Sequence, residues 1–297
     1  MSTDSQTTAS VPDALLGPAP AIDTFLRGYV DSLGLAPGLD GAVRYALLGG
    51  GKRVRPVLAW WCGVAVGGTG EDTLPGGAAV ELVHAFSLVH DDLPAMDDDD
   101  LRRGKPTLHV RSGEAMAILA GDAMLALAFG ALRRAPAEHL GSLTDELLTG
   151  TNAMIGGQIY DTLGGLDKSL TDIERLEAIH RNKTGALIRA ACRMGGTLGG
   201  GDSEAIERLT TYGEAVGLMF QIVDDLLDVE SCDKRTGKRT GKDADAGKLT
   251  YPRVLGVDGA RREIARLGGQ ARESLHAFGG RAAALSDLAG YLERRGA

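Results

Sequence analysis

The sequence is poor in cysteine: Cys62, Cys192 and Cys232 are the only ones in 297 residues, and no two of them have CxxC spacing. A disulfide framework or a structural zinc site requires cysteines in even or clustered sets. This odd, scattered set argues against both kinds of site. It is typical of a protein from a reducing compartment, so we expect a cytoplasmic location.

An excess of basic residues is also absent. The chain has 32 Lys and Arg residues against 40 Asp and Glu residues, for a formal charge of −8. General binding of nucleic acid requires a basic surface. The charge balance therefore argues against a nucleic-acid partner, and acidic clusters in such a chain could instead hold cations.

The N-terminal residues lack the features of a signal peptide. Residues 1–20 are rich in Ser, Thr, Ala and Pro, with neither a basic start nor an apolar core, and they predict a disordered tail. The longest apolar stretch, 115–132, contains Asp122. It falls short of the roughly 20 apolar residues that span a membrane. We interpret it as a buried helix of a soluble bundle, without integral membrane association.

Alternation of apolar and polar residues is scarce, whereas the 3.6-residue periodicity of helices is common. The sequence therefore predicts an all-α protein. No linker separates segments of different composition, so we expect one helical domain over residues 21–297. The periodicity predicts helices at about 21–35, 38–48, 53–66, 75–93, 111–133, 142–163, 172–197, 203–229 and 249–258, with a C-terminal pair near 260–295.

The first of two aspartate clusters ends an apolar helical run. His84, Ser87 and Asp91 stand at i, i+3 and i+7 and share one helix face. Pro94 disfavours continuation of the helix, so Asp97 can fold back toward Asp91. Such carboxylates suit Mg²⁺, which takes oxygen ligands and shares its remaining positions with water and phosphate.

The second cluster forms a polar stripe on an apolar helix, with Gln221, Asp224 and Asp228 at i, i+3 and i+7. Carboxylates among apolar neighbours are costly unless they are paired or bound to metal. The alternative for either cluster is a helix cap or a solvated acidic loop. A calcium loop is disfavoured because the EF-hand pattern, with its central Gly and final Glu, is missing.

Several basic residues stand beside glycines and are candidate diphosphate ligands. Lys52 and Arg55 follow three glycines and, three residues apart, can point the same way. This segment is not a Walker A loop, because Lys52 is followed by Arg53. Further candidates are Arg102, Arg103, Lys105, Lys183 with Thr184, Lys238 and Lys248. Each alone could be a solvated surface charge, but beside two acidic clusters they indicate two polyanions, at least one of them held through metal.

Six motifs in order carry a family resemblance: GGGKRVRP, HAFSLVHDDLPAMDDDDLRRGKPT, GGQIYD, KTGALI, GLMFQIVDDLLDV and TGKRTGKDADAGKLTYP. They span roughly residues 40–255 and resemble the trans-isoprenyl diphosphate synthases, or polyprenyl synthetase family. The resemblance implies a single-domain helical bundle around a central cavity, the isoprenoid synthase fold, usually in a homodimer. It also implies a prenyl transferase that uses isopentenyl diphosphate and an allylic diphosphate.

The resemblance assigns a role to each candidate residue. It places isopentenyl diphosphate on Lys52, Arg55, His84 and Arg103, and the allylic diphosphate on Arg102, Lys183, Thr184, Gln221, Lys238 and Lys248. Asp91, Asp97 and Asp224 would hold Mg²⁺ and, with Lys183, form the catalytic set. Loss of the diphosphate would leave an allylic cation, which the double bond of isopentenyl diphosphate attacks before a proton passes to the released diphosphate. No side-chain nucleophile is required.

Three other functions compete with this interpretation. A class I terpene cyclase would carry an Asn/Ser/Glu metal motif in place of the Asp224–Asp228 cluster. A non-catalytic prenyl synthase subunit generally lacks one of the two aspartate clusters, and both are intact here. The third is a structural or ion-binding helical protein. Release of diphosphate from the two five-carbon substrates would separate all of these.

Product length is predicted from Phe86, which stands five residues before Asp91, next to Ser87. In the family this position often lies in the floor of the elongation pocket, and an aromatic ring there resembles farnesyl synthases. We therefore expect the C15 product, farnesyl diphosphate, with C20 geranylgeranyl diphosphate as the alternative. The competing interpretation places Phe86 in the helical core, since it lies about 140° around the helix from Asp91, compared with about 40° for Ser87.

Overall fold

The computed structural model describes residues 16–234 and 249–296. Residues 1–15 of the predicted tail lie outside this part of the chain. The last five tail residues are described, and the first helix begins at Ala19 within them. Leu16 packs against the hydrophobic core, so the ordered chain begins before residue 21.

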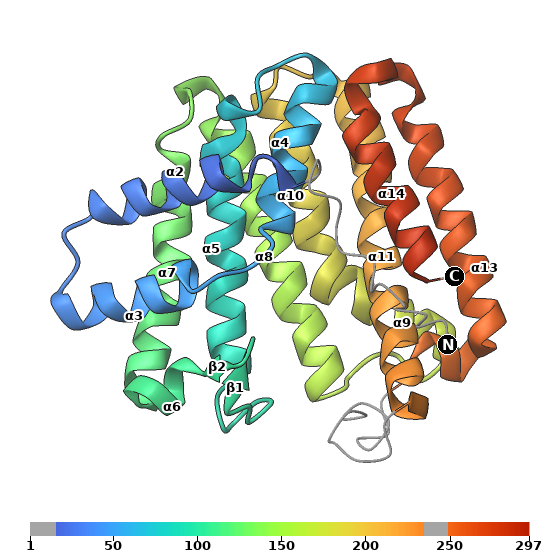
Figure 1. Ribbon diagram of the computed structural model, residues 1–297, viewed down its shortest axis with the longest axis horizontal. Helices are drawn as coiled ribbons and strands as arrows, with labels where there is room; N and C mark the ends of the chain where they lie inside the picture. Colours follow the sequence, from blue (N-terminus) through green and yellow to red (C-terminus); the bar gives the residue numbers. More distant parts are fainter. Residues whose placement is uncertain (1–15, 235–248, 297) are drawn as a thin grey trace, which may run out of the picture.

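The fold is an all-α bundle, as the sequence predicted (Figure 1). Its long helices are α2 (Ala19–Asp31), α3 (Pro37–Leu48), α4 (Val54–Val66), α5 (Leu74–Asp91), α7 (Glu114–Leu132), α8 (Leu140–Thr162), α9 (Asp172–His180), α10 (Ala186–Leu198), α11 (Ser203–Lys234), α13 (Tyr251–Leu275) and α14 (Ala283–Arg295). The short elements are α6 (Leu108–Ser112), the turns η1 (Glu71–Thr73), η2 (Ala137–His139), η3 (Arg181–Gly185) and η4 (His276–Ala282), and the strands β1 (Leu101–Arg102) and β2 (Lys105–Pro106).

Two helices predicted as continuous are interrupted. The segment 111–133 breaks at Gly113, whose φ of 85° lies in the left-handed region, so α6 and α7 are separate. The segment 172–197 contains the π-helical turn η3, which joins α9 to α10. A single π-turn adds one residue to an otherwise helical run, and the sequence pattern did not reveal it.

The hairpin of β1 and β2 was not predicted. Its strands pair Leu101 with Pro106 and Arg102 with Lys105. The two residues of the turn, Arg103 and Gly104, have φ angles of 54° and 73°. Two positive φ angles are typical of the tight turn that joins short antiparallel strands. The segment follows the first aspartate cluster and lies at the C-terminal end of α5 (Figure 1).

Helix α5 lies inside the bundle, with α7 on one side and α4 and α10 on the other (Figure 1). Twelve of its 18 residues are buried, from Pro75 to Val89. It packs mostly against α7, α4 and α10, while α13 and α14 pair at the far side of the molecule. The first aspartate cluster therefore starts where a buried helix reaches the surface.

Glycines let α4 and α10 pack closely. A Cβ atom added to Gly195 would lie 2.2 Å from the carbonyl oxygen of Ala59, and one added to Gly199 would lie 2.6 Å from that of Gly63. Only glycine fits at such backbone contacts, because protein interiors are close-packed. The high glycine content thus has a structural role in this helical protein.

Helix α7 is buried on one face only, so the expectation of a buried helix holds for that face alone. By length and composition it is the one helix in the described ranges that could cross a membrane, with a mean hydropathy of 1.9, and 39% of its most apolar stretch is buried. The packing of α7 on α5 explains the buried face. Ile118 and Leu119 remain 44% and 59% exposed.

We predict that Gly195→Ala lowers the free energy of unfolding by about 1–3 kcal/mol, because its methyl group would overpack the contact with Ala59. Gly28 is the matched control. It lies inside α2, and a Cβ atom there would meet no atom within 4 Å. Gly28→Ala should therefore raise stability by up to about 1 kcal/mol. Urea denaturation would measure both values, and equal effects of the two substitutions would contradict the packing argument.

Candidate functional site

Two adjoining cavities bring most of the predicted site residues together. The first, of about 480 Å³, is lined by Gly51, Lys52, Arg53, Val54, Arg55, Glu81, His84 and Arg103. The second, of about 700 Å³, lies between α5 and α8, and Phe86, Ser87, Asp91, Lys183 and Thr184 are among its lining residues. Arg55 and His84 line both cavities, so a ligand in one would lie next to a ligand in the other.

The first cavity is strongly cationic. Burial lowers the pKa of Arg55, and its Nε atom is buried without a hydrogen-bond partner. Burial and the neighbouring arginines also lower the pKa of His84 well below its usual range, so this ring is neutral at pH 7. Incompletely satisfied cations in a desolvated cavity favour a polyanion such as diphosphate.

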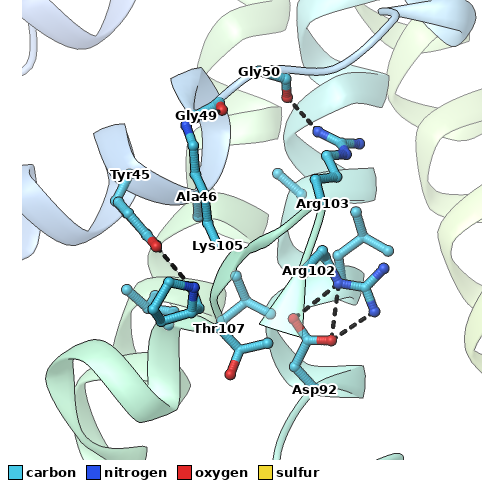
Figure 2. Close-up of a pocket in the computed structure, with 14 residues that line it drawn as sticks. Tyr45, Ala46, Gly49, Gly50, Asp92, Arg102, Arg103, Lys105 and Thr107 are labelled. Carbon is cyan, nitrogen blue, oxygen red and sulfur yellow. Dashed lines mark hydrogen bonds and ion pairs between the residues drawn. The ribbon is translucent and has the colours of Figure 1, made fainter. Parts of the chain in front are cut away.

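The glycine loop, residues 49–51, and the β1–β2 hairpin are joined by hydrogen bonds beside this cavity (Figure 2). Arg103 donates a hydrogen bond to the carbonyl of Gly50, and Lys105 donates one of 3.0 Å to that of Gly49. Gly51 has a φ of 142°, and a Cβ atom there would lie 2.6 Å from Nη1 of Arg103. The loop therefore needs glycine both for its conformation and for the room that Arg103 occupies.

Asp92 binds Arg102, a contact that the sequence analysis missed. Nε of Arg102 donates to both carboxylate oxygens of Asp92 at 2.9 Å, and Nη2 donates to Oδ1 at 2.6 Å (Figure 2). Asp92 is buried, with 3% of its surface exposed. The pair fixes Arg102, predicted to bind the allylic diphosphate, at the end of α5. The adjacent letters DD and RR gave no sign of which residues would pair.

The second cavity is lined by apolar and polar residues in equal number. Phe86 is 7% exposed, belongs to the core and also lines the cavity, with its ring edge-on to His90 at 5.5 Å. Both interpretations of Phe86 from the sequence therefore describe part of its environment. The other apolar lining residues are Leu88, Leu93, Ala95, Met96, Met154, Ile155, Ile159 and Leu163.

Lys183 is positioned by a carboxylate that the sequence analysis did not single out. Its Nζ atom lies 2.6 Å from Oδ2 of Asp161, and the two side chains are 27% and 16% exposed. A Cβ atom on Gly157 would lie 2.2 Å from the backbone nitrogen of Lys183, so glycine lets α8 approach η3. Gly157 and Asp161 both belong to the motif GGQIYD. This motif was the only indication in the sequence that Asp161 lies at the site.

The next residue joins η3 to α11. Thr184 donates a hydrogen bond of 2.7 Å from Oγ1 to Oε1 of Gln221. Gln221 and Asp224 are one turn apart on α11 and share a face, so Asp224 lies on the side of α11 that meets η3. Lys238 and Lys248, also predicted to bind the allylic diphosphate, lie outside the described residues.

The first aspartate cluster folds back as predicted. The backbone N–H of Asp97 donates to the carbonyl of Asp91 at 2.8 Å, after α5 has ended at Asp91. Burial raises the pKa of Asp91 to about 6, with Lys183 opposing and Asp97 adding to the shift. Burial likewise raises the pKa of Asp224 to about 6, against the effect of Arg295. Each ionised carboxylate thus lacks enough protein cation to offset its desolvation.

The carboxylates of Asp91, Asp97 and Asp224 are suitable ligands for a divalent cation, although they do not form a ready-made cluster. Across 16–234 and 249–296, no three Asp, Glu, His or Cys side chains are close enough to hold an ion by themselves. Asp91 and Asp97 come from one cluster and Asp224 from another. Mg²⁺ typically takes one or two carboxylates and completes its shell with water and substrate phosphate. Separate carboxylates facing a diphosphate site are compatible with that behaviour.

Asp225 has a different role from its neighbour Asp224. Its Oδ2 atom accepts a hydrogen bond of 2.9 Å from the backbone N–H of Tyr251 and lies 3.5 Å from Nε2 of His180. The rings of His180 and Tyr251 stack at 5.8 Å. Asp225 therefore ties α11 to the end of α9 and the start of α13, next to η3.

We predict that Asp91→Asn raises the melting temperature of the metal-free protein at pH 7.5. The folded-state pKa of Asp91, about 6, lies above the ordinary value of 3.8. Between pH 3.8 and about 6 the folded protein therefore binds more protons at Asp91 than the unfolded protein does. Protonation of Asp91 stabilises the fold at low pH, and this stabilisation is lost as the pH rises through 6. The gain from the amide should accordingly shrink toward zero as the pH falls to about 4.

Differential scanning calorimetry from pH 4 to 8 in chelator would measure this difference. Asp100→Asn, at an exposed carboxyl of the same cluster, is the matched control and should leave the melting temperature unchanged. A smaller gain is expected for Asp224→Asn, because Asp224 is desolvated but has more exposed surface than Asp91, and solvent screens its charge. A melting temperature of Asp91→Asn that follows the wild type at every pH would contradict the burial argument.

Comparison with known proteins bears on this geometry. The chain matches the family "Polyprenyl synthetase" over residues 36–276. It is 45% identical over 271 residues to geranylgeranyl pyrophosphate synthase 11, chloroplastic, from Arabidopsis thaliana, covering 86% of this chain and 74% of that one. It is 42% identical over 290 residues to geranylgeranyl pyrophosphate synthase 7, chloroplastic, from the same plant, covering 95% and 83%.

Solved structures share the fold as well as the sequence. A geranyltransferase from Legionella pneumophila superposes with a TM-score of 0.81 at 34% identity, covering 95% of this chain and 96% of that one. A FPP/GFPP synthase from Zymomonas mobilis superposes with a TM-score of 0.77 at 34% identity, covering 95% and 98%. The two joined cavities, the ordered motifs and these similarities lead to one assignment: the chain belongs to the polyprenyl synthetase family of trans-prenyl transferases.

Proposed function

We propose that this protein condenses isopentenyl diphosphate with allylic diphosphates in a Mg²⁺-dependent reaction and releases diphosphate. The observation that carries the proposal is the junction of the two cavities at Arg55 and His84. One cavity is cationic and the other combines Asp91 and Lys183 with apolar walls. A homoallylic and an allylic diphosphate bound there would be neighbours, as carbon–carbon bond formation requires.

The residues of each cavity support a distinct task. Lys52, Arg55 and Arg103 bind the diphosphate of isopentenyl diphosphate, while Lys183 and Thr184 bind that of the allylic substrate. Mg²⁺, when bound by the aspartates, would neutralise charge on the departing diphosphate. The apolar walls exclude water, which would otherwise capture the allylic cation. The proton lost in the final step passes to the released diphosphate, as in the family mechanism.

We propose C20 geranylgeranyl diphosphate as the main product. The Arabidopsis relatives that share 42–46% of their residues with this chain carry that name. The C15 product expected from the sequence rests on Phe86, an aromatic residue in the cavity wall. It remains the second candidate, because a ring in a close-packed wall limits the length of the growing tail.

We further propose that two copies of the chain pair through α7 and α8. Ile118 and Leu119 on α7 and Leu148, Ile155 and Ile159 on α8 are 41–59% exposed. The two helices contact each other, and exposed apolar residues on adjoining helices are typical of a protein interface. Ile155 and Ile159 also line the second cavity, and a partner would therefore shield it from water.

Purified protein incubated with isopentenyl diphosphate, dimethylallyl diphosphate and Mg²⁺ should release diphosphate and yield a C20 product by mass spectrometry. Excess chelator should abolish turnover. Activity that persisted in chelator, or cyclised hydrocarbon products, would contradict the proposed reaction. A C15 product would support the reaction and favour the second candidate for length.

We predict that Phe86→Ala shifts the product distribution to chains longer than those of the wild type, because removing the ring deepens the cavity beside His90. Mass spectrometry of the extracted products would measure the shift. Phe278→Ala is the matched control: this ring is also 7% exposed but belongs to η4, away from both cavities. An unchanged product distribution in Phe86→Ala would rule out Phe86 as a length determinant.

We predict that Ile155→Glu shifts the protein from dimer to monomer, since a charge within an apolar interface is desolvated without a partner. Light scattering coupled to gel filtration would measure the mass. Leu255→Glu, at a residue of α13 that is 40% exposed, is the control and should leave the dimer intact. A wild-type protein that is monomeric at micromolar concentration would contradict the pairing.

A further inference from the structure

The cationic cavity contains one acidic side chain among its described lining residues, Glu81 of α5. This side chain is 6% exposed, and its Oε1 atom accepts a hydrogen bond of 2.8 Å from Nη1 of Arg53. A buried carboxylate beside a diphosphate site would repel the ligand. Glu81 should therefore make a contribution to the site that outweighs this repulsion.

The partner of Glu81, Arg53, has a second ion pair and an unusual backbone conformation. Arg53 is 4% exposed, and its Nε atom donates to Oδ1 of Asp23 on α2 at 2.8 Å. Its φ of 51° and ψ of 36° lie in the left-handed region that non-glycine residues rarely adopt. Two carboxylates from two different helices thus hold Arg53 in a backbone conformation that is unfavourable on its own.

That backbone conformation sets the geometry of the cavity. The carbonyl of Arg53 accepts the hydrogen bond from Val57 that starts α4. Lys52 directly precedes Arg53, and Arg55 follows it in the first turn of α4. A rotation at Arg53 would therefore move both predicted ligands of the diphosphate.

The three arginines that line the cavity also differ in their hydrogen-bond partners. Arg53 is occupied by Glu81 and Asp23, and Arg103 contacts the carbonyl of Gly50. Nε of Arg55, by contrast, is buried without a protein partner. Glu81 opposes the desolvation of both Arg55 and Arg103 through its charge. The carboxylate thus engages one arginine directly and leaves the donors of another for a ligand.

We propose that Glu81 is a positioning residue for the isopentenyl diphosphate site: by binding Arg53 it holds the left-handed turn that places Lys52 and Arg55. The proposal rests on the proposed function of this cavity. Arg53, although part of the motif GGGKRVRP, is then a structural brace and not a diphosphate ligand. Two opposite outcomes distinguish positioning from simple repulsion when the charge of Glu81 is removed.

The test is Glu81→Gln, which keeps the shape of the side chain and removes its charge. A positioning role predicts that isopentenyl diphosphate binds about tenfold more weakly, because the hydrogen bond from Arg53 loses the carboxylate charge that strengthens it. The KM for the allylic substrate should stay within about twofold of the wild-type value, well inside that tenfold change. Simple repulsion predicts the reverse, tighter binding of isopentenyl diphosphate.

Isothermal titration of isopentenyl diphosphate into the metal-free protein would measure binding without turnover, and steady-state kinetics would give the KM for each substrate. Glu71→Gln, at an exposed residue of η1, is the matched control and should bind as the wild type does. Arg53→Lys keeps the charge but loses the two-sided bonding, and it should weaken the same substrate to a similar degree. It also serves as the second variant if Glu81→Gln does not fold.

The outcomes separate the inference from the proposed function. Wild-type protein that does not bind isopentenyl diphosphate would contradict the proposed function itself. Wild-type binding together with unchanged or tighter binding by folded Glu81→Gln would overturn the positioning role alone. Equal loss of both substrates in Glu81→Gln and Arg53→Lys would also overturn it, because general damage to the fold would explain that result.

Discussion

Ion pairs between buried or partly exposed carboxylates and cations determine where several basic side chains of this protein lie. Glu81 and Asp23 hold Arg53, Asp92 holds Arg102, and Asp161 holds Lys183. A charge withdrawn from water is costly unless a partner offsets the loss of solvation. These three cations therefore take the positions that their carboxylates allow.

In the second aspartate cluster, Asp225 likewise connects elements that are distant in the sequence. Asp224 faces the side of α11 that meets η3, while Asp225 points to Tyr251 and His180. Adjacent carboxylates on a helix point about 100° apart, so one can hold a ligand while the other holds the scaffold. The contacts of Asp225 join three helices around the turn that carries Lys183.

The sequence predicted the helical class, most helix positions and several of the residues that line the cavities, because apolar periodicity and ordered motifs depend on neighbouring residues. It did not predict the hairpin, whose turn requires a positive φ at Arg103. Nor did it identify Asp161 and Glu81, since their partners lie 22 and 28 positions away in the chain. Spacing along one helix cannot show which carboxylate a distant cation will choose. Lys238 and Lys248 stay predictions.

The π-helical turn η3 changes the rotational phase between α9 and α10. A residue advances an α-helix by about 100°, and a π-turn holds one residue more than an α-turn. The extra residue lets α9 and α10 each keep its own apolar side toward the core, while Lys183 and Thr184 turn toward α8 and α11. Deleting a single residue from Arg181–Gly185 would therefore rotate α10 by about 100° relative to α9. Only one of the two helices could then keep its apolar side toward the core, and Lys183 and Thr184 would lose their contacts with Asp161 and Gln221.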